Sequence, residues 1–371
     1  MSLTAGIVGL PNVGKSTLFN AITNANVLAA NYPFATIQPN TGVVEVNDPR
    51  FDKLVKMFSP KKQVKATFEF TDIAGLVKGA SKGEGLGNQF LSNIRSTDMI
   101  IHVVRCFDSS VINTYNGRGI DPLSDVEEVN LELVLSDMDV MKKRLEKIER
   151  TAVMTKDKEK LIEVSAIKKL LAAFDKGQMA KEAELSSDEK DAIKSFNLIT
   201  SKPMIYVANV DEDSYSDPEK NRYYSSLKKF AEDHGTICIP VSALTEEELT
   251  KVSKDERKEY LESLGMSLTG LDRITLASYH LLGLRTFFTC GSDEVRAWTY
   301  KDGMSAPNCA GIIHSDFEKN FIRAEVYSYD DLMTYGSELK VKENGKLQIV
   351  GKDYLVKDGD ILFIRSGAIK K

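Results

Sequence analysis

Residues 9–16 read Gly-Leu-Pro-Asn-Val-Gly-Lys-Ser, which matches a phosphate-binding loop at every fixed position of that pattern. In such a loop, glycines let successive backbone N–H groups turn toward a row of phosphates, and a lysine reaches the β- and γ-phosphates. Lys15 occupies the lysine position, and the hydroxyl of Ser16 is placed to bind Mg²⁺. We therefore expect nucleotide phosphates to be bound by Asn12, Val13, Gly14, Lys15, Ser16 and Thr17.

The elements on either side of this loop are those needed to position it. Residues 3–8 form an apolar, β-branched run, and residues 17–23 open a helix with Leu18, Phe19 and Ile22 facing inward. A strand, a loop and a helix in this order put a bound anion at the N-terminus of the helix, where N–H groups and the helix dipole favour negative charge. The context therefore favours phosphate binding over a chance glycine-containing turn.

Two further segments carry residue types that suit a magnesium-bound triphosphate. Asp72 ends an apolar strand predicted at 66–72, where a carboxylate can hold Mg²⁺ through water, and the N–H of Gly75 can contact a γ-phosphate. Thr36, in an irregular segment before that strand, can offer its hydroxyl to Mg²⁺ once a γ-phosphate orders the loop. Leu76 stands where many guanine-nucleotide hydrolases have a glutamine that orients water, so we expect slow intrinsic hydrolysis.

The charge that develops during hydrolysis must then be stabilised by other groups. Asn12 is a candidate to hold a monovalent cation that bridges the phosphates, although asparagine is also a common turn-forming residue. The glycine-rich stretch at 75–87 predicts a loop that reorders with the bound nucleotide. We expect Lys15, Asn12, Gly75 and Leu76 to govern the rate of hydrolysis.

The nucleobase pocket is predicted from the residues that follow a strand expected at 204–208. Guanine-specific proteins of this type read N-K-x-D there, and the aspartate accepts two N–H donors of guanine. Here Glu212 replaces the aspartate and Val210 the lysine. One extra methylene displaces the carboxylate, and a buried donor left without its acceptor costs about 1–3 kcal/mol. The sequence therefore favours ATP over GTP.

Other residues complete this predicted pocket. Asn209 can bond the adenine edge, since its amide offers both a donor and an acceptor. Ser242, Ala243 and Leu244 fit the last loop around the base. A register shift in which Asp211 or Asp213 restores guanine recognition is the alternative.

The pattern of the 371-residue chain predicts three domains. Residues 1–120 and 200–280 alternate strands and helices, which is typical of an α/β nucleotide-binding domain. Residues 121–199 carry apolar residues at alternating intervals of three and four, the pattern of two antiparallel helices inserted as an arm. Residues 285–371 contain short strand patterns separated by Asp-Gly and Asn-Gly turns, which predict a compact β-rich domain. The helical seam is expected at Leu131, Val134, Met138, Met141, Leu145 and Ile148, and then at Val164, Ile167, Leu171 and Phe174.

Composition limits the possible partners and location. The net charge of −5 gives no general attraction to nucleic acid, so we expect no DNA partner. The four cysteines form no C-x-x-C pair, and no apolar run approaches the length of a membrane span. We therefore expect a cytoplasmic protein with no membrane association.

Taken together, these motifs resemble the YchF subfamily of the Obg-related P-loop NTPases, also called Obg-like ATPases. The resemblance is carried by residues 9–16, by N-Y-P-F-A-T at 31–36, by the long string at 72–88 and by N-V-D-E at 209–212. It implies a P-loop NTPase of the Ras-like G-domain type, with an inserted antiparallel helical arm and a C-terminal TGS domain of β-grasp fold. It also implies ATP as substrate, Mg²⁺, potassium-stimulated hydrolysis, and association with the ribosome or its large subunit, with possible RNA contact.

The chain departs from this family at one position. The family commonly has a histidine in the loop after the fourth strand, whereas residues 107–119 contain none. His102 lies within an apolar strand and is expected in the core. Two alternatives stay open: a GTPase of the same fold, and a ribosome- or RNA-binding adaptor whose nucleotide is hardly hydrolysed.

Overall fold

The computed structural model describes residues 3–27, 41–73, 86–109, 112, 117 and 119–367. The molecule divides into two units. The first contains Met1–Val43 and Glu69–Ile274, and the second contains Val44–Phe68 and Thr275–Lys371. Strands β2 (Thr41–Glu45) and β4 (Thr67–Asp72) therefore carry the chain out of the first unit and back into it.

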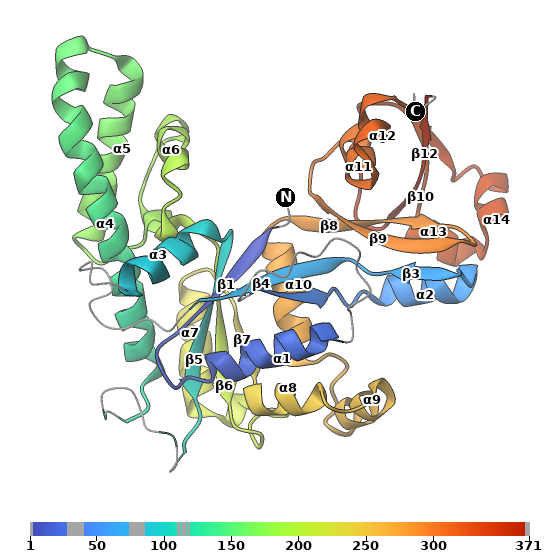
Figure 1. Ribbon diagram of the computed structural model, residues 1–371, viewed down its shortest axis with the longest axis horizontal. Coiled ribbons are helices and arrows are strands. Elements are labelled where there is room, and N and C mark those ends of the chain that lie inside the picture. Colours follow the sequence, from blue (N-terminus) through green and yellow to red (C-terminus); the bar gives the residue numbers. More distant parts are fainter. Residues whose placement is uncertain are drawn as a thin grey trace. The chain divides into compact units, whose positions relative to one another are not determined.

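A twisted sheet forms the centre of the first unit (Figure 1). Among the described residues its strand order is β2-β4-β1-β5-β6-β7, and β1 runs parallel to both β4 and β5. Every residue of β5 and β6 is buried, as expected for parallel strands covered on both faces. The predicted α/β architecture is confirmed. The remaining strands of this sheet are β1 (Thr4–Val8), β5 (Met99–Cys106), β6 (Met204–Val210) and β7 (Cys238–Val241).

Helices follow the strands of this sheet along the chain. Helix α1 begins at Lys15, two residues earlier than predicted, so Lys15 and Ser16 belong to its first turn. Leu18 and Ile22 are buried on its inner face, as expected. The other helices are α3 (Leu86–Ser96), α7 (Arg222–Asp233), α8 (Ala243–Leu249), α9 (Lys254–Ser263) and α10 (Gly270–Leu281), the last of which continues into the second unit.

The predicted helical arm is present as a pair of long helices, α4 (Pro122–Thr155) and α5 (Lys158–Phe174), which lie side by side in Figure 1. Helix α4 ends just before Lys156, where φ is 51°, and Asp157 caps α5. Most of the expected seam is buried or half-buried, but Leu131 is 51% exposed and its assignment to the seam was wrong. The chain returns to the sheet through η3 (Ala180–Glu182), α6 (Ser187–Ile193), η4 (Lys194–Phe196) and η5 (Ile199–Ser201).

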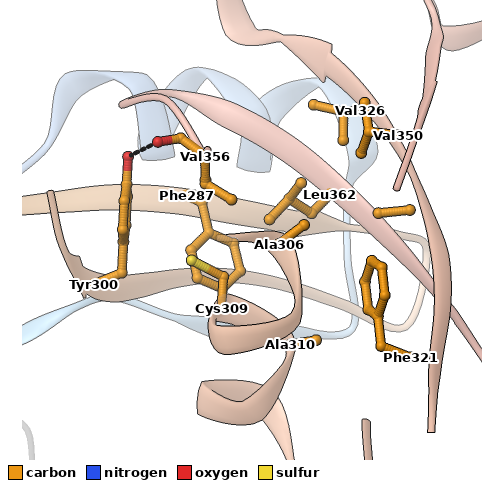
Figure 2. Close-up of a cluster of buried hydrophobic side chains, with 11 residues drawn as sticks. Phe287, Tyr300, Ala306, Cys309, Ala310, Phe321, Val326, Val350, Val356 and Leu362 are labelled. Carbon is orange, nitrogen blue, oxygen red and sulfur yellow. Dashed lines mark hydrogen bonds between the residues drawn. The ribbon is translucent and has the colours of Figure 1, made fainter. Parts of the chain in front are cut away.

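The second unit is built on a mixed sheet. Strand β8 pairs antiparallel with β9, β10 pairs antiparallel with β12, and β12 runs parallel to β8. Its strand order, among the described residues, is β11-β10-β12-β8-β9-β3. Helix α11 (Ala306–Ile313) packs on one face, and Figure 2 shows the resulting core, in which the Tyr300 hydroxyl donates to the Val356 carbonyl at 3.0 Å. The strands are β8 (Leu284–Cys290), β9 (Glu294–Lys301), β10 (Phe321–Ser328), β11 (Gln348–Val350) and β12 (Asp360–Ser366), and the short helices are α12 (Ser315–Lys319), α13 (Tyr329–Tyr335) and α14 (Glu338–Glu343).

One part of the second unit was not predicted from the sequence. Helix α2 (Pro49–Phe58) and strand β3 (Lys62–Val64) come from the N-terminal half of the chain, and β3 pairs with β9. Arg50 fixes this segment: its guanidinium bonds Asp48 and Asp358, both at 2.8 Å, and lies over the Phe288 ring. Residues 44–68 are therefore an integral part of the C-terminal fold.

Candidate nucleotide-binding site

The residues predicted to bind nucleotide follow the carboxyl ends of parallel strands in the first unit. The phosphate loop follows β1, Asp72 ends β4, Asn209 is the penultimate residue of β6, and Ser242 follows β7. In open α/β sheets, ligands bind at this edge, because the loops there converge and helix N-termini point outward. The topology brings the predicted residues to one edge of one sheet.

Two glycines of the phosphate loop are required by close contacts. At Gly14 φ is +91°, and a Cβ atom there would lie 2.1 Å from the Asn209 side-chain nitrogen. At Gly9 a Cβ atom would lie 2.6 Å from the carbonyl oxygen of Val103, on the neighbouring strand β5. Only glycine lets the loop pass this close to the sheet and turn its N–H groups outward.

The lysine of the loop is held against the carboxylate at the end of β4. Lys15 Nζ lies 3.3 Å from Asp72 Oδ1, and the exposed fractions of the two side chains are 9% and 23%. Ser16, in the same turn of α1, is exposed. A hydroxyl and a carboxylate beside a phosphate loop are the oxygen donors that Mg²⁺ prefers, so Ser16 and Asp72 fit the predicted metal roles.

Asn209 connects the phosphate loop to the loop after β7. Its Nδ2 donates to the Val13 carbonyl at 2.9 Å, and its Oδ1 accepts from the Ala243 N–H at 3.0 Å. The side chain is almost fully buried. Asn209 therefore holds the phosphate loop and the start of α8, which lie far apart in the chain, in a fixed relation.

The predicted base-contacting residues lie beyond this bridge. Ser242 is buried and caps α8, its Oγ accepting from the Thr245 N–H at 3.3 Å. The Thr245 hydroxyl also lies 3.5 Å from Glu212 Oε1, whereas the apolar side chain of Leu244 is exposed. Glu212 itself is exposed. This end of the site thus combines a carboxylate, a hydroxyl and an open apolar side chain.

The structure describes two of the remaining predicted residues, Asn12 and Val210, but not the other three. Asn12 is exposed at the tip of the loop with φ of 65°, while Val210 is buried at the end of β6. Thr36, Gly75 and Leu76 lie outside the described residues, so their assigned roles stay predictions.

Comparison with known proteins identifies the family. Residues 4–210 match the family described as "50S ribosome-binding GTPase", and residues 284–367 match the family YchF-GTPase_C, described as a protein of unknown function. The chain is 51% identical to the "Ribosome-binding ATPase YchF" of Bacillus subtilis (strain 168), over 98% of this chain and 99% of that protein. The chain belongs to the YchF family. The protein of the same name from Escherichia coli O157:H7 is 47% identical over 98% of both chains.

A solved YchF-family structure confirms the fold. The "Structure of the Schizosaccharomyces pombe YchF GTPase" matches with a TM-score of 0.88 and 39% identity, covering 98% of each chain. The resemblance drawn from the motifs is thereby confirmed, together with the P-loop fold that it implied. The names given to these relatives differ on the nucleotide, since some say ATPase and others GTPase.

Glu246 is a structural residue of this YchF-family site that the motifs did not reveal. Its buried carboxylate accepts from the Gly270 N–H at 2.6 Å and from the Tyr215 hydroxyl at 2.5 Å. Burial raises the pKa of Glu246. It ties α8, which Ser242 begins, to the start of α10 and to the segment after β6. No local pattern marks it, because its partners are distant in sequence.

The prediction that His102 is a core residue is confirmed. It is buried in β5 with its ring centroid 5.5 Å from that of Tyr206. Desolvation lowers the pKa of His102 to about 3, so the ring is neutral at physiological pH. Among the described helices, none is long and apolar enough to cross a bilayer.

Proposed function

We propose that this protein binds ATP and slowly hydrolyses it with Mg²⁺, acting as a nucleotide-controlled switch on the ribosome. The observation that carries the proposal is the 3.3 Å contact between Lys15 of a complete phosphate loop and Asp72 at the end of β4, at the carboxyl edge of the sheet. The relatives called "Ribosome-binding ATPase YchF" cover nearly the whole chain, which supports the ribosome as partner and the cytoplasm as location.

The phosphate chemistry follows from the residues present. Lys15 would leave Asp72 for the β- and γ-phosphates, because a fully charged triphosphate offers the ammonium group more negative charge than one carboxylate does. Backbone N–H groups from Gly14 to Thr17 would bind the phosphate oxygens at the start of α1. Ser16, Thr36 and Asp72 would hold Mg²⁺, the last through water, and the ion would neutralise charge on the leaving phosphate.

The choice of base rests on Glu212. Asn209 Nδ2 carries two N–H donors, and it can offer the second to N7, an atom that adenine and guanine share. Discrimination between adenine and guanine must therefore come from the Glu212 carboxylate. Its side chain is one methylene longer than the aspartate that recognises guanine in guanine-specific proteins. The Asp211 carboxylate already accepts from the Ser214 N–H at 2.8 Å, which supports Glu212 over a shifted register.

The rate of hydrolysis is the second part of the proposal. A leucine at position 76 has no group with which to orient water, so turnover is slow without help. We propose that Asn12, at the exposed tip of the loop, holds K⁺ against the phosphates and so supplies positive charge to the transition state. An adaptor that hardly turns over its nucleotide is the competing function.

Competition binding and hydrolysis assays test the proposal. ATP should displace a fluorescent adenine nucleotide at a lower concentration than GTP does, and hydrolysis should rise when potassium and ribosomes are added. Tighter GTP binding would replace the proposal by a GTPase of the same fold. Tight ATP binding without stimulation by either addition would favour the adaptor.

A further inference from the structure

An ion pair between a half-buried arginine and a fully buried aspartate joins the last turn of α3 to the base of the helical arm. Arg95 Nη1 lies 3.0 Å from Asp137 Oδ1, and the Asp137 side chain, on α4, is 0% exposed. Arg95 also donates to the carbonyl of Asn197 at 3.1 Å and to the hydroxyl of Ser136 at 3.3 Å. One guanidinium therefore contacts α4 and the segment that returns from the arm.

Asp137 is the centre of this contact. Its Oδ1 also accepts from the Ile199 N–H at 3.1 Å, and its Oδ2 accepts from the N–H of Thr200 at 2.8 Å and from the Thr200 hydroxyl at 2.7 Å. With Arg95 included, its two oxygens accept bonds from α3 and from η5, so a fully buried carboxylate is satisfied only while these elements stay together.

The backbone of α3 is held at the same place. Lys202 Nζ donates to the Arg95 carbonyl at 3.0 Å and also to the Thr97 carbonyl. Ile94, next to Arg95, is fully buried. The end of α3 thus cannot shift without moving the base of the arm or breaking charged, buried contacts.

Helix α3 is also connected to the nucleotide site through the chain. It is the first described element after Asp72, whose carboxylate contacts Lys15. In nucleotide switches, elements next to the γ-phosphate take up different arrangements in the two nucleotide states. A displacement at the start of α3 would therefore reach Arg95 at its end.

We infer that Arg95 is a positioning residue of the nucleotide cycle, which through Asp137 transmits the position of α3 to the helical arm. The inference rests on the proposed function, because it requires a bound nucleotide that acts on α3. The side-chain contacts of Arg95 are with Asp137, Ser136 and Asn197, so it acts through Asp137 on the arm.

Hydrogen exchange of the full-length protein, with ADP or with a non-hydrolysable ATP analogue, tests this inference. In the wild type, exchange should differ between the two nucleotides at the phosphate loop and at the base of the arm, residues 132–141 and 197–202. Typical couplings between sites are about fivefold or more, and Arg95→Met should reduce the difference at the arm base to less than about twofold. The difference at the phosphate loop should remain.

Two variants keep this test specific. Arg144→Met removes a comparable ion pair, with Glu163 at 2.6 Å, that lies within the arm and does not involve α3. It should leave the nucleotide response of the arm base intact. Arg95→Lys keeps the charge but cannot contact Asp137, Ser136 and Asn197 at the same time, so the nucleotide response of the arm base should be intermediate. This variant replaces Arg95→Met in the test if Arg95→Met does not fold.

The possible outcomes separate the two proposals. No protection of the wild-type phosphate loop by the ATP analogue would overturn the proposed function and this inference with it. Protection of the loop with an unchanged response of the arm base in Arg95→Met would overturn the inference alone. A purely structural role would raise exchange equally with both nucleotides and leave their ratio unchanged, which also overturns it.

Discussion

The phosphate end and the base end of the nucleotide site are built in different ways. The phosphate end comes from one continuous loop, with Asp72 at the end of β4 beside its lysine. The base end brings together the end of β6, the loop after β7 and the first turn of α8, which Asn209 and Thr245 hold in place. We therefore expect affinity for the triphosphate to be a local property of the sequence, and selection of the base to depend on contacts between distant segments.

The largest effect is expected at the phosphate end. Lys15→Ala removes the charged group that contacts Asp72, and hydrogen bonds to charged groups contribute about 1.5–3 kcal/mol each. Two phosphate contacts of this kind predict a loss of at least about a hundredfold in affinity for ATP and GTP alike. Titration of a fluorescent nucleotide measures it. Lys147→Ala, at an exposed position of the arm, is the control, and equal affinities in the two variants would contradict the assignment.

The bridge between the two ends should affect stability as well as binding. Asn209→Ala leaves the Val13 carbonyl and the Ala243 N–H without their side-chain partner, which costs about 1–3 kcal/mol of folding free energy. Affinity for ATP and GTP should fall together, so their ratio should not change. Urea unfolding and nucleotide titration measure the two effects. Asn93→Ala, on the exposed side of α3, is the control. A changed ATP-to-GTP ratio would show that Asn209 selects the base.

The same contrast explains how far the sequence could predict the structure. The phosphate loop, the helical arm and the strands of the first sheet other than β2 were predictable, because each depends on residues close together in the chain or on a regular apolar period. The five C-terminal strands were also predictable, because Gly303, Gly345 and Gly359 mark turns with positive φ.

Features that depend on distant partners left no such signal. Strand β3 is short and mostly exposed, and only its pairing with β9 makes it a strand. The exposed side chains of Lys61 and Lys62 pair with Asp293 and Glu294 across that junction, and the linear sequence does not indicate these partners. Glu246 and Asp137 resemble ordinary helical surface acids in the sequence, and only the fold reveals that both are buried and fully bonded.

The base end should show a moderate effect that is selective. Glu212→Asp shortens the carboxylate to the length that recognises guanine, so affinity for GTP relative to ATP should rise by about tenfold, within the 1–3 kcal/mol range of one buried donor. Competition between ATP and GTP for the same fluorescent nucleotide measures the ratio.

A matched control distinguishes a change in base selection from a general effect of shortening an exposed glutamate. Glu248→Asp makes the same substitution at an exposed position of α8 and should leave the ratio unchanged. If Glu212→Asp binds GTP no better than the wild type does, base selection resides elsewhere, and Asp213 becomes the next candidate.

The smallest effect is expected at Asn12, because it should alter only the rate of hydrolysis and only in potassium. Asn12→Gly removes the side chain while the backbone keeps its φ of 65°, a conformation that glycine adopts without strain. Hydrolysis in sodium should be unchanged, and the stimulation by potassium should disappear. Phosphate release in the two salts, at saturating ATP, measures this.

Asn12→Ala shows whether the side chain or the backbone is responsible. Alanine also lacks the amide, but it is strained by about 1–2 kcal/mol in the left-handed region, so the loop itself is disturbed. If alanine abolishes the potassium effect while glycine retains it, the backbone of the loop binds the cation and the Asn12 side chain does not. That result would make the phosphate end depend on main-chain groups and Lys15 alone, and would widen its contrast with the side-chain-built base end.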